Sequence, residues 1–160
     1  MRDLDRIDRK ILRLLQDDGR MSMTELAERV GLSVTPCSER VRRLERDRFI
    51  LGYHARLDPH ALGQKLLVFV ELKLAAKSVP IFDASRREVL KLPYVLECHL
   101  VSGEFDYLIK ARIAEMGAYR KLLGDMLLAL PGARESRSYI VMEEIKESLS
   151  VHVAEPSGRS

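Results

Sequence analysis

Apolar residues recur at helical spacing near the start of the chain and outline two short helices. The first set follows Asp3, a candidate N-cap, and its pattern stops at Gly19. Its apolar members are Leu4, Ile7, Ile11 and Leu14. The second set follows the S-x-x-E capping box Ser22–Glu25 and stops at Gly31, a residue suited to ending a helix.

A third helix is expected directly after the tight connection Gly31–Ser33. Thr35 is its candidate N-cap, Pro36 takes its first position, and the pattern continues to about Arg48. One face is apolar and comprises Cys37, Val41 and Leu44, whereas the opposite face carries Thr35, Glu39, Arg42 and Arg46. Three helices with a short glycine-containing turn before the last are typical of a helix-turn-helix. The segment FILGYHARLD, residues 49–58, predicts a short two-stranded wing.

The rhythm of the chain changes after residues 57–65, which contain Pro59 and Gly63 and break the periodicity. Period-two and helical patterns then alternate in the order βαββαβ. The expected strands are 66–76, 94–101, 105–113 and 134–147, and the expected helices are 81–92 and 116–130. The sequence thus predicts an α+β protein, an N-terminal winged helix-turn-helix joined to a C-terminal ferredoxin-like βαββαβ domain.

The expected sheet keeps apolar residues on both of its faces. If Val68 and Val70 face the helices, Leu67 and Phe69 point to the other side, and Leu108 does the same in a later strand. A sheet face with large apolar groups is normally covered, and a second copy is the simplest cover. We therefore expect a homodimer, whose two recognition helices would suit DNA half-sites about 34 to 36 Å apart.

Composition narrows the class of protein. A chain of 160 residues with 46% hydrophobic content can bury a core and is not predominantly disordered. The longest apolar run, Leu66–Val70, is far too short to span a membrane, and the N-terminus is too charged for a signal peptide. Cys37 and Cys98 share no disulfide or zinc spacing, so packed thiols are expected. We expect a cytoplasmic protein without a membrane partner.

The distribution of charge bears on function only in the third helix, where arginines are concentrated. The net charge of +3 permits a nucleic-acid partner without requiring one. Five arginines lie between Arg40 and Arg48, and they suit either phosphate and guanine contacts or a solvated face balanced by neighbouring acids. A small trihelical protein-interaction module is the alternative to a DNA-binding one. The candidate DNA-binding residues are Ser33, Thr35, Pro36, Ser38, Glu39, Arg40, Arg42, Arg43 and Arg46. Because the helix contains no Asn or Gln, we expect bendable DNA to supply part of the selectivity.

Several long blocks of the chain resemble the Lrp/AsnC family of bacterial and archaeal transcription regulators. They include DLDRIDRKIL from Asp3, ELAERVGLSVTPCSERVRRLER from Glu25, ECHLVSGEFDYLIK from Glu97 and YIVMEEIK from Tyr139. The resemblance implies that residues 1–58 bind double-stranded DNA, and the break in periodicity predicts that 59–65 form a linker. The resemblance also implies that 66–150 bind an amino-acid effector, with leucine the first expectation, and assemble dimers and often octamers. Residues 151–160 look like a disordered tail.

The loop VSGEFDY offers a physical basis for effector binding. Gly103 accommodates a positive φ, which frees backbone N–H groups to hold a carboxylate, and Asp106 could pair with the α-ammonium. A plain hairpin with Asp106 capping its turn is the alternative from the residues alone. With the resemblance, the candidate effector-binding residues are Ser102, Gly103, Glu104, Phe105, Asp106, Tyr139 and Val141.

Two other functions compete with an effector-controlled regulator. An enzyme would need a convergent acid–base set, which the sequence lacks, so no catalytic residue, metal or cofactor is expected. Cys98 and His99 are adjacent in a strand and point to opposite faces, so they form no nucleophile–base pair. A nucleoid-associated architectural protein would bend or wrap DNA without needing a ligand, and ligand sensitivity distinguishes it from a regulator.

Overall fold

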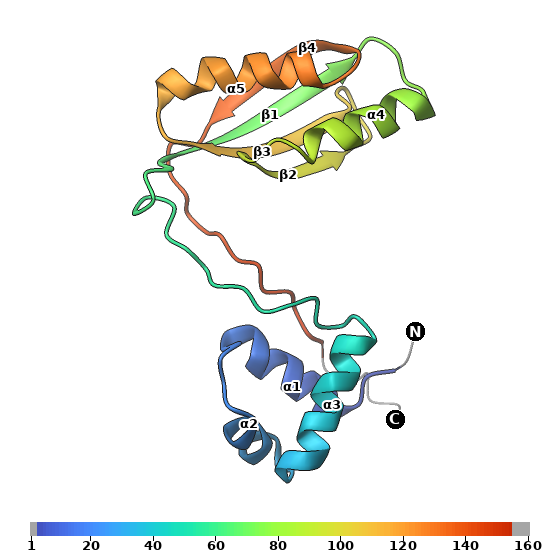
Figure 1. The fold of residues 1–160 in the computed structure, drawn as a ribbon, viewed down its shortest axis with the longest axis vertical. Helices are drawn as coiled ribbons and strands as arrows, with labels where there is room; N and C mark the ends of the chain where they lie inside the picture. The colour runs from blue at the N-terminus through green and yellow to red at the C-terminus, as the bar shows by residue number, and fades with distance from the viewer. Residues whose placement is uncertain (1–2, 155–160) are drawn as a thin grey trace. The chain divides into compact units, whose positions relative to one another are not determined.

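The computed structural model describes residues 3–154 and divides into two compact units, each described below by itself (Figure 1). The helix unit comprises residues 3–56 together with 146–154, and the sheet unit comprises residues 57–145. This division falls beside the predicted boundary at residue 58. Residues 59–65, predicted as a linker, lie in the sheet unit, where the Gln64 N–H donates to the Pro59 carbonyl at 2.7 Å.

The helix unit contains α1 (Arg6–Asp17), α2 (Met23–Val30) and α3 (Val34–Arg46). Asp5 caps α1, because its carboxylate accepts the Asp8 N–H at 2.7 Å, so the cap predicted at Asp3 is wrong. The predicted box at α2 is confirmed: the Ser22 hydroxyl accepts the Glu25 N–H at 3.2 Å. Gly31 ends α2 in the left-handed conformation, with a φ of 76°.

The bounds of α3 and the wing differ from the prediction. Ser33 is the N-cap, so the cap predicted at Thr35 is wrong and Pro36 lies in the first turn but not at its first position. The helix ends at Arg46 because Arg48 adopts a φ of 60°, which cannot continue a helix. Among the described residues, 49–58 contain no strand, so the two paired strands predicted for the wing do not form and the segment is irregular.

The core of the helix unit lies between its three helices. Cys37, Val41 and Leu44, the predicted apolar face of α3, are all buried. They pack with fully buried residues of the other two helices, Ile11 and Leu26. One face of α3 therefore remains at the surface.

The sheet unit contains four antiparallel strands in the order β2-β3-β1-β4, with both helices on one face (Figure 1). This is the predicted ferredoxin-like arrangement. The strands are β1 (Leu66–Leu74), β2 (Val95–Leu100), β3 (Tyr107–Ile113) and β4 (Ala133–Ile140), and the helices are α4 (Val79–Val89) and α5 (Met116–Ala129). The core lies between the sheet and the helices and includes Val68, Val70, Leu72, Ile109 and Met126.

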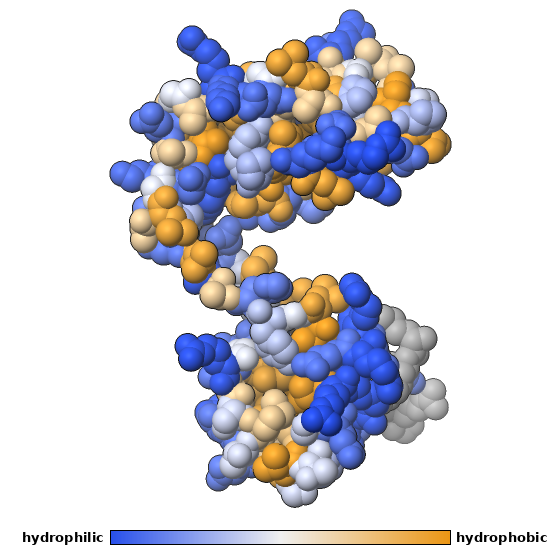
Figure 2. Space-filling view, viewed as in Figure 1, coloured by the Kyte–Doolittle hydropathy of each residue, from blue (hydrophilic) through white to orange (hydrophobic). Residues whose placement is uncertain are grey.

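The opposite sheet face retains apolar groups beside charged ones. Phe69, Leu108 and Tyr139 alternate with the core positions of their strands, and Phe69 lies directly across from Tyr139 in the register. Tyr139 is 44% exposed. Hydrophobic areas, shown in orange, interrupt the hydrophilic surface of both units (Figure 2).

The end of the chain behaves differently from the prediction. β4 ends at Ile140 rather than Glu147, and residues 141–154 contain no regular element. Residues 149–154, which we call the strap, lie in the helix unit beside α1. A disordered tail was predicted from residue 151, but the Val151 N–H donates to the Gln16 side chain at 2.8 Å. The rest of that tail, 155–160, lies outside the described residues.

Candidate functional site

The surface face of α3 brings together most of the predicted DNA-binding residues. Ser33, Thr35, Glu39, Arg42 and Arg46 are exposed, whereas Pro36 and Ser38 are partly buried. Two guanidinium groups and several hydroxyls are thus presented on the helix that, in a helix-turn-helix, enters the major groove. Arg46 makes only an exposed ion pair with Asp47, at 2.9 Å, which is worth little.

Arg40 and Arg43 have a different place from the other predicted residues. Arg40 donates to Asp5 at 2.6 Å and to Asp8 at 2.8 Å, and Arg43 donates to Asp8 at 3.3 Å. Asp8 is fully buried, so two arginines of α3 are held by a carboxylate of α1. This network links α3 to α1 and to its N-cap.

The pKa of Asp5 is consistent with its hydrogen bonds in this network. Burial alone raises the pKa of Asp5, but the hydrogen bonds from the Asp8 N–H and Arg40 outweigh it and lower that pKa below its ordinary value. The prediction missed Asp8, although the sequence held a signal. Asp8 precedes Ile11 by three residues and Leu15 by seven, which places a carboxylate on the apolar face of the helix.

A small cavity of about 120 Å³ lies on the open side of the sheet. Its lining comes from β1, β4 and the β2–β3 loop and comprises Glu71, Lys73, Glu104, Phe105, Glu135, Ser136 and Arg137. Three carboxylates and two cations therefore surround one cavity. A zwitterion needs both signs of charge close together, and this cavity supplies them.

The predicted effector residues divide between this cavity and other places. Glu104 and Phe105 line it, whereas Ser102 and Gly103 are exposed in the loop. Tyr139 is connected to the cavity because its hydroxyl donates to Glu71 at 3.1 Å. The Val141 N–H donates to the Leu67 carbonyl at 2.9 Å and extends the pairing beyond β4.

Asp106 holds the loop to the sheet. Its carboxylate accepts the Leu74 N–H at 2.8 Å and lies 2.7 Å from the Lys77 ammonium, while its backbone N–H donates to the Leu72 carbonyl. Burial by itself raises the pKa of Asp106. The hydrogen bond from the Leu74 amide and the charge of Lys77 together outweigh burial, so the pKa lies below its ordinary value. The carboxylate is thus already bonded within its own unit.

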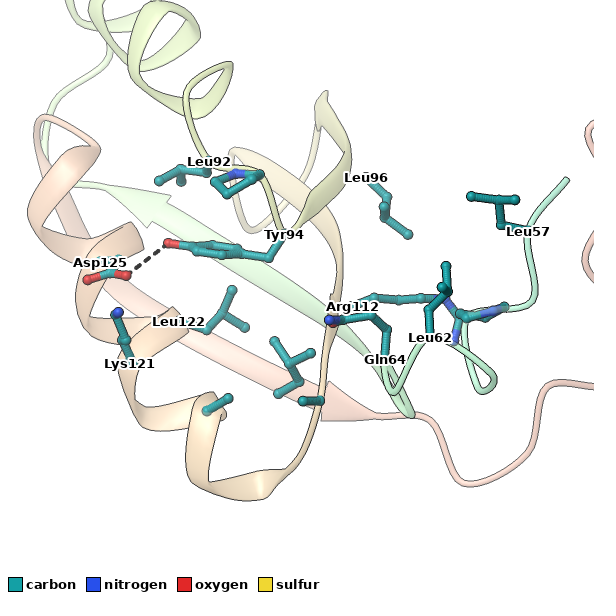
Figure 3. Close-up of a pocket in the computed structure, with 15 residues that line it drawn as sticks. Leu57, Leu62, Gln64, Leu92, Tyr94, Leu96, Arg112, Lys121, Leu122 and Asp125 are labelled. Carbon is teal, nitrogen blue, oxygen red and sulfur yellow. Dashed lines mark hydrogen bonds between the residues drawn. The ribbon is translucent and has the colours of Figure 1, made fainter. Parts of the chain in front are cut away.

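A larger apolar groove of about 860 Å³ lies elsewhere in the sheet unit, and the sequence did not predict it. Leu92, Leu96 and Leu122 point into it in Figure 3. At one end the Tyr94 hydroxyl donates to Asp125 at 3.3 Å. Burial and the Asp125 charge raise the pKa of Tyr94 to about 12.

Residues 3–154 contain neither a candidate metal site nor a candidate membrane-spanning helix. These residues contain no cluster of three or more side chains suited to holding a metal ion. Among them there is also no helix whose length and hydropathy would let it cross a membrane.

Each of the two units matches a known protein family. Residues 4–50 match the model of the winged helix-turn-helix DNA-binding family, and residues 67–151 match the Lrp/AsnC ligand binding domain. The leucine-responsive regulatory protein of Escherichia coli (strain K12) is 59% identical over 147 residues, which cover 92% of this chain and 90% of that protein.

Solved structures of transcription regulators have the same fold as this chain. A transcriptional regulator from Neisseria meningitidis, in complex with L-Met, matches with a TM-score of 0.88 and 35% identity over 94% of this chain and 97% of that one. The feast or famine regulatory protein from M. tuberculosis, complexed with L-methionine, matches with a TM-score of 0.87 and 35% identity over 95% of this chain and 100% of that one. The predicted fold class is confirmed, and so is the prediction of a regulator rather than an enzyme. The chain belongs to the Lrp/AsnC family of transcription regulators, with a DNA-binding helix-turn-helix and an amino-acid-binding domain.

Proposed function

We propose that this regulator reads DNA with the exposed face of α3 and that leucine or a similar apolar amino acid adjusts its binding. The observation that carries the DNA part is the division of the arginines of α3. Arg40 and Arg43 are bonded to α1, whereas Arg42 is exposed on the helix that enters the groove. Arg42 is therefore the main candidate for a base or phosphate contact, with Thr35, Ser38 and Glu39 beside it.

The amino-acid part is supported by the cavity at the β2–β3 loop. Its cations suit the α-carboxylate, and Glu104, Glu71 and Glu135 suit the α-ammonium. We assign Asp106 a positioning role, because its carboxylate already holds Leu74 and Lys77. The L-methionine in two similar structures supports an apolar amino acid, and the name of the E. coli relative makes leucine the first one to test.

The position of the cavity supports assembly. Its lining residues Glu71, Lys73 and Arg137 lie on the open side of the sheet, so a second copy packed on that side would help to close the cavity. The open sheet face carries Phe69, Leu108 and Tyr139, which a second copy would cover. A homodimer fits both features, and the resemblance to the family extends this proposal to an octamer on DNA in the nucleoid.

The test of DNA reading is a gel shift at fixed salt with the DNA upstream of the protein's own gene. Arg42→Ala should weaken binding by about 1 to 3 kcal/mol, roughly 5- to 150-fold, if the guanidinium contacts a base. Arg87→Ala, which removes an exposed arginine of α4, is the matched control and should leave binding unchanged. Equal binding by both variants would remove α3 from the proposed interface.

The test of the effector is calorimetry with L-leucine and L-methionine. Glu104→Gln should weaken binding at least tenfold, because it removes a charge from the ammonium side of the cavity. The control is Glu88→Gln, because Glu88 lies on α4 and makes a surface ion pair with Lys91, beyond the end of that helix. Specific DNA binding that none of the twenty amino acids changes would instead favour the architectural role.

A further inference from the structure

The strap is bound to α1 through its backbone. The Gln16 amide donates to the Val151 carbonyl at 2.9 Å and accepts the Val151 N–H at 2.8 Å. Arg9 donates to the Ala154 carbonyl at 2.9 Å, and Arg13 donates to the Val153 carbonyl at 3.5 Å. Three side chains from successive turns of one helix thus engage an extended segment of chain more than a hundred residues away.

The manner of binding resembles the addition of a strand. A primary amide carries a donor and an acceptor, so Gln16 pairs with Val151 as a neighbouring peptide group would. The side chain of Val151 contributes little, since 69% of that residue is exposed. The contact is therefore specified by main-chain groups, and a change at the Val151 side chain should preserve it.

The strap is held without dense packing. A cavity of about 610 Å³ lies between it, α1 and the residues that follow α3, and its lining includes Leu4, Leu12, Phe49, Ile50 and Leu149. Tight packing contributes most of the stability of a buried segment, so a strap held mainly by a few surface hydrogen bonds can detach while the rest of the helix unit stays folded.

The strap connects the sheet unit to the helix unit along the chain, because it follows β4 in sequence and contacts α1. Residues 141–148, which contain no helix or strand, lead to it from β4, and β4 supplies Glu135 and Arg137 to the cavity at the loop. On the other side, the strap binds α1, whose Asp5 and Asp8 hold Arg40 and Arg43 of α3. The chain therefore joins the two units twice, once before the sheet and once after it.

We propose that the strap is a releasable tether through which a ligand at the loop cavity changes the DNA binding of α3. A ligand that shifts β4 alters the pull on residues 141–148, and the strap passes that change to α1 and its arginine partners. A ligand can do this only if it favours one of two states, strap bound or strap released. The inference rests on the proposed amino-acid response.

The experiment uses the full chain and a proline at one position. Val151→Pro removes the N–H that donates to Gln16, whereas Val151→Ala keeps it. His152→Pro is the proline control, because among the described residues no hydrogen bond is made by the His152 N–H. Gln16→Ala removes the same contact from α1. Each variant is assayed by gel shift with and without L-leucine and L-methionine, and by calorimetry with the same amino acids.

We expect Val151→Pro and Gln16→Ala to bind the amino acid within twofold of the wild type but to lose its effect on DNA affinity. Val151→Ala and His152→Pro should keep that effect. The tether is refuted if Val151→Pro responds like the wild type, if His152→Pro loses the response equally, or if Val151→Pro loses amino-acid binding itself. A wild-type chain that responds to no amino acid would refute the proposed function, and the tether with it, so the two failures are distinguishable.

Discussion

Replacing Asp8 with alanine should destabilise the helix unit more than any other single loss of charge in α1. Asp8 is fully buried and receives hydrogen bonds from Arg40 at 2.8 Å and Arg43 at 3.3 Å. Removing one partner of a buried ion pair costs about 3 to 5 kcal/mol. The arginine side chains remain 25% and 35% exposed, and Arg40 keeps its bond to Asp5, so water and that carboxylate compensate in part. We expect a loss of about 2 kcal/mol.

Urea unfolding of the full chain, followed by hydrogen exchange in peptides of α1 to α3, measures this loss in the helix unit alone. With a slope of about 1 kcal/mol per molar urea, the midpoint should fall by roughly 2 M. Asp17→Ala, an exposed carboxylate on the same helix, should change stability by less than about 0.5 kcal/mol. Equal midpoints for the two variants would show that the Asp8 network does not hold α3. The Asp8 effect should also persist in salt, because buried pairs are poorly screened.

Three further predictions concern single positions. Asp106 has a lowered pKa, so its contribution to stability is present above about pH 4 and is lost as the pH falls through the folded value; the stability difference between wild type and Asp106→Asn should therefore shrink in acid, measured by circular dichroism. Tyr94, with a pKa of about 12, stabilises the sheet unit below pH 10 and loses this effect between pH 10 and 12, and Tyr94→Phe should remove one late-ionising tyrosine from an absorbance titration. Gly31→Ala should cost about 1 kcal/mol in urea unfolding, because the φ of 76° is strained for alanine although the added methyl meets open space.

The sequence allowed the fold to be predicted where the signals are local. The capping box at Ser22, the glycine at 31 and the apolar face of α3 each depend on residues within a turn or two, and all three are confirmed. The βαββαβ order follows from alternating periodicities in the same way. The exact ends of the helices were harder to predict from the sequence. Ser33 and Thr35 are both residues that favour an N-cap, and only packing decides between them.

The sites depend on contacts between distant parts of the chain, which local patterns do not contain. Arg40 and Arg43 are predicted to contact DNA, and their pairing with Asp8, more than thirty residues earlier, could not be predicted from the local pattern. Asp106 is predicted as an ammonium ligand, and its bonds to Lys77 and Leu74 are contacts that no local pattern indicates. A charged side chain has many possible partners, and only the fold selects one.

The helix unit is assembled from two stretches of chain, and this order matters during synthesis. α1 to α3 leave the ribosome first, but the strap follows only after residues 57–145. At about 5 to 20 residues per second, the wait is roughly 5 to 20 s, far longer than helices need to form. The nascent DNA-binding helices therefore fold unstrapped, and Gln16 receives its partner only after the sheet unit has emerged.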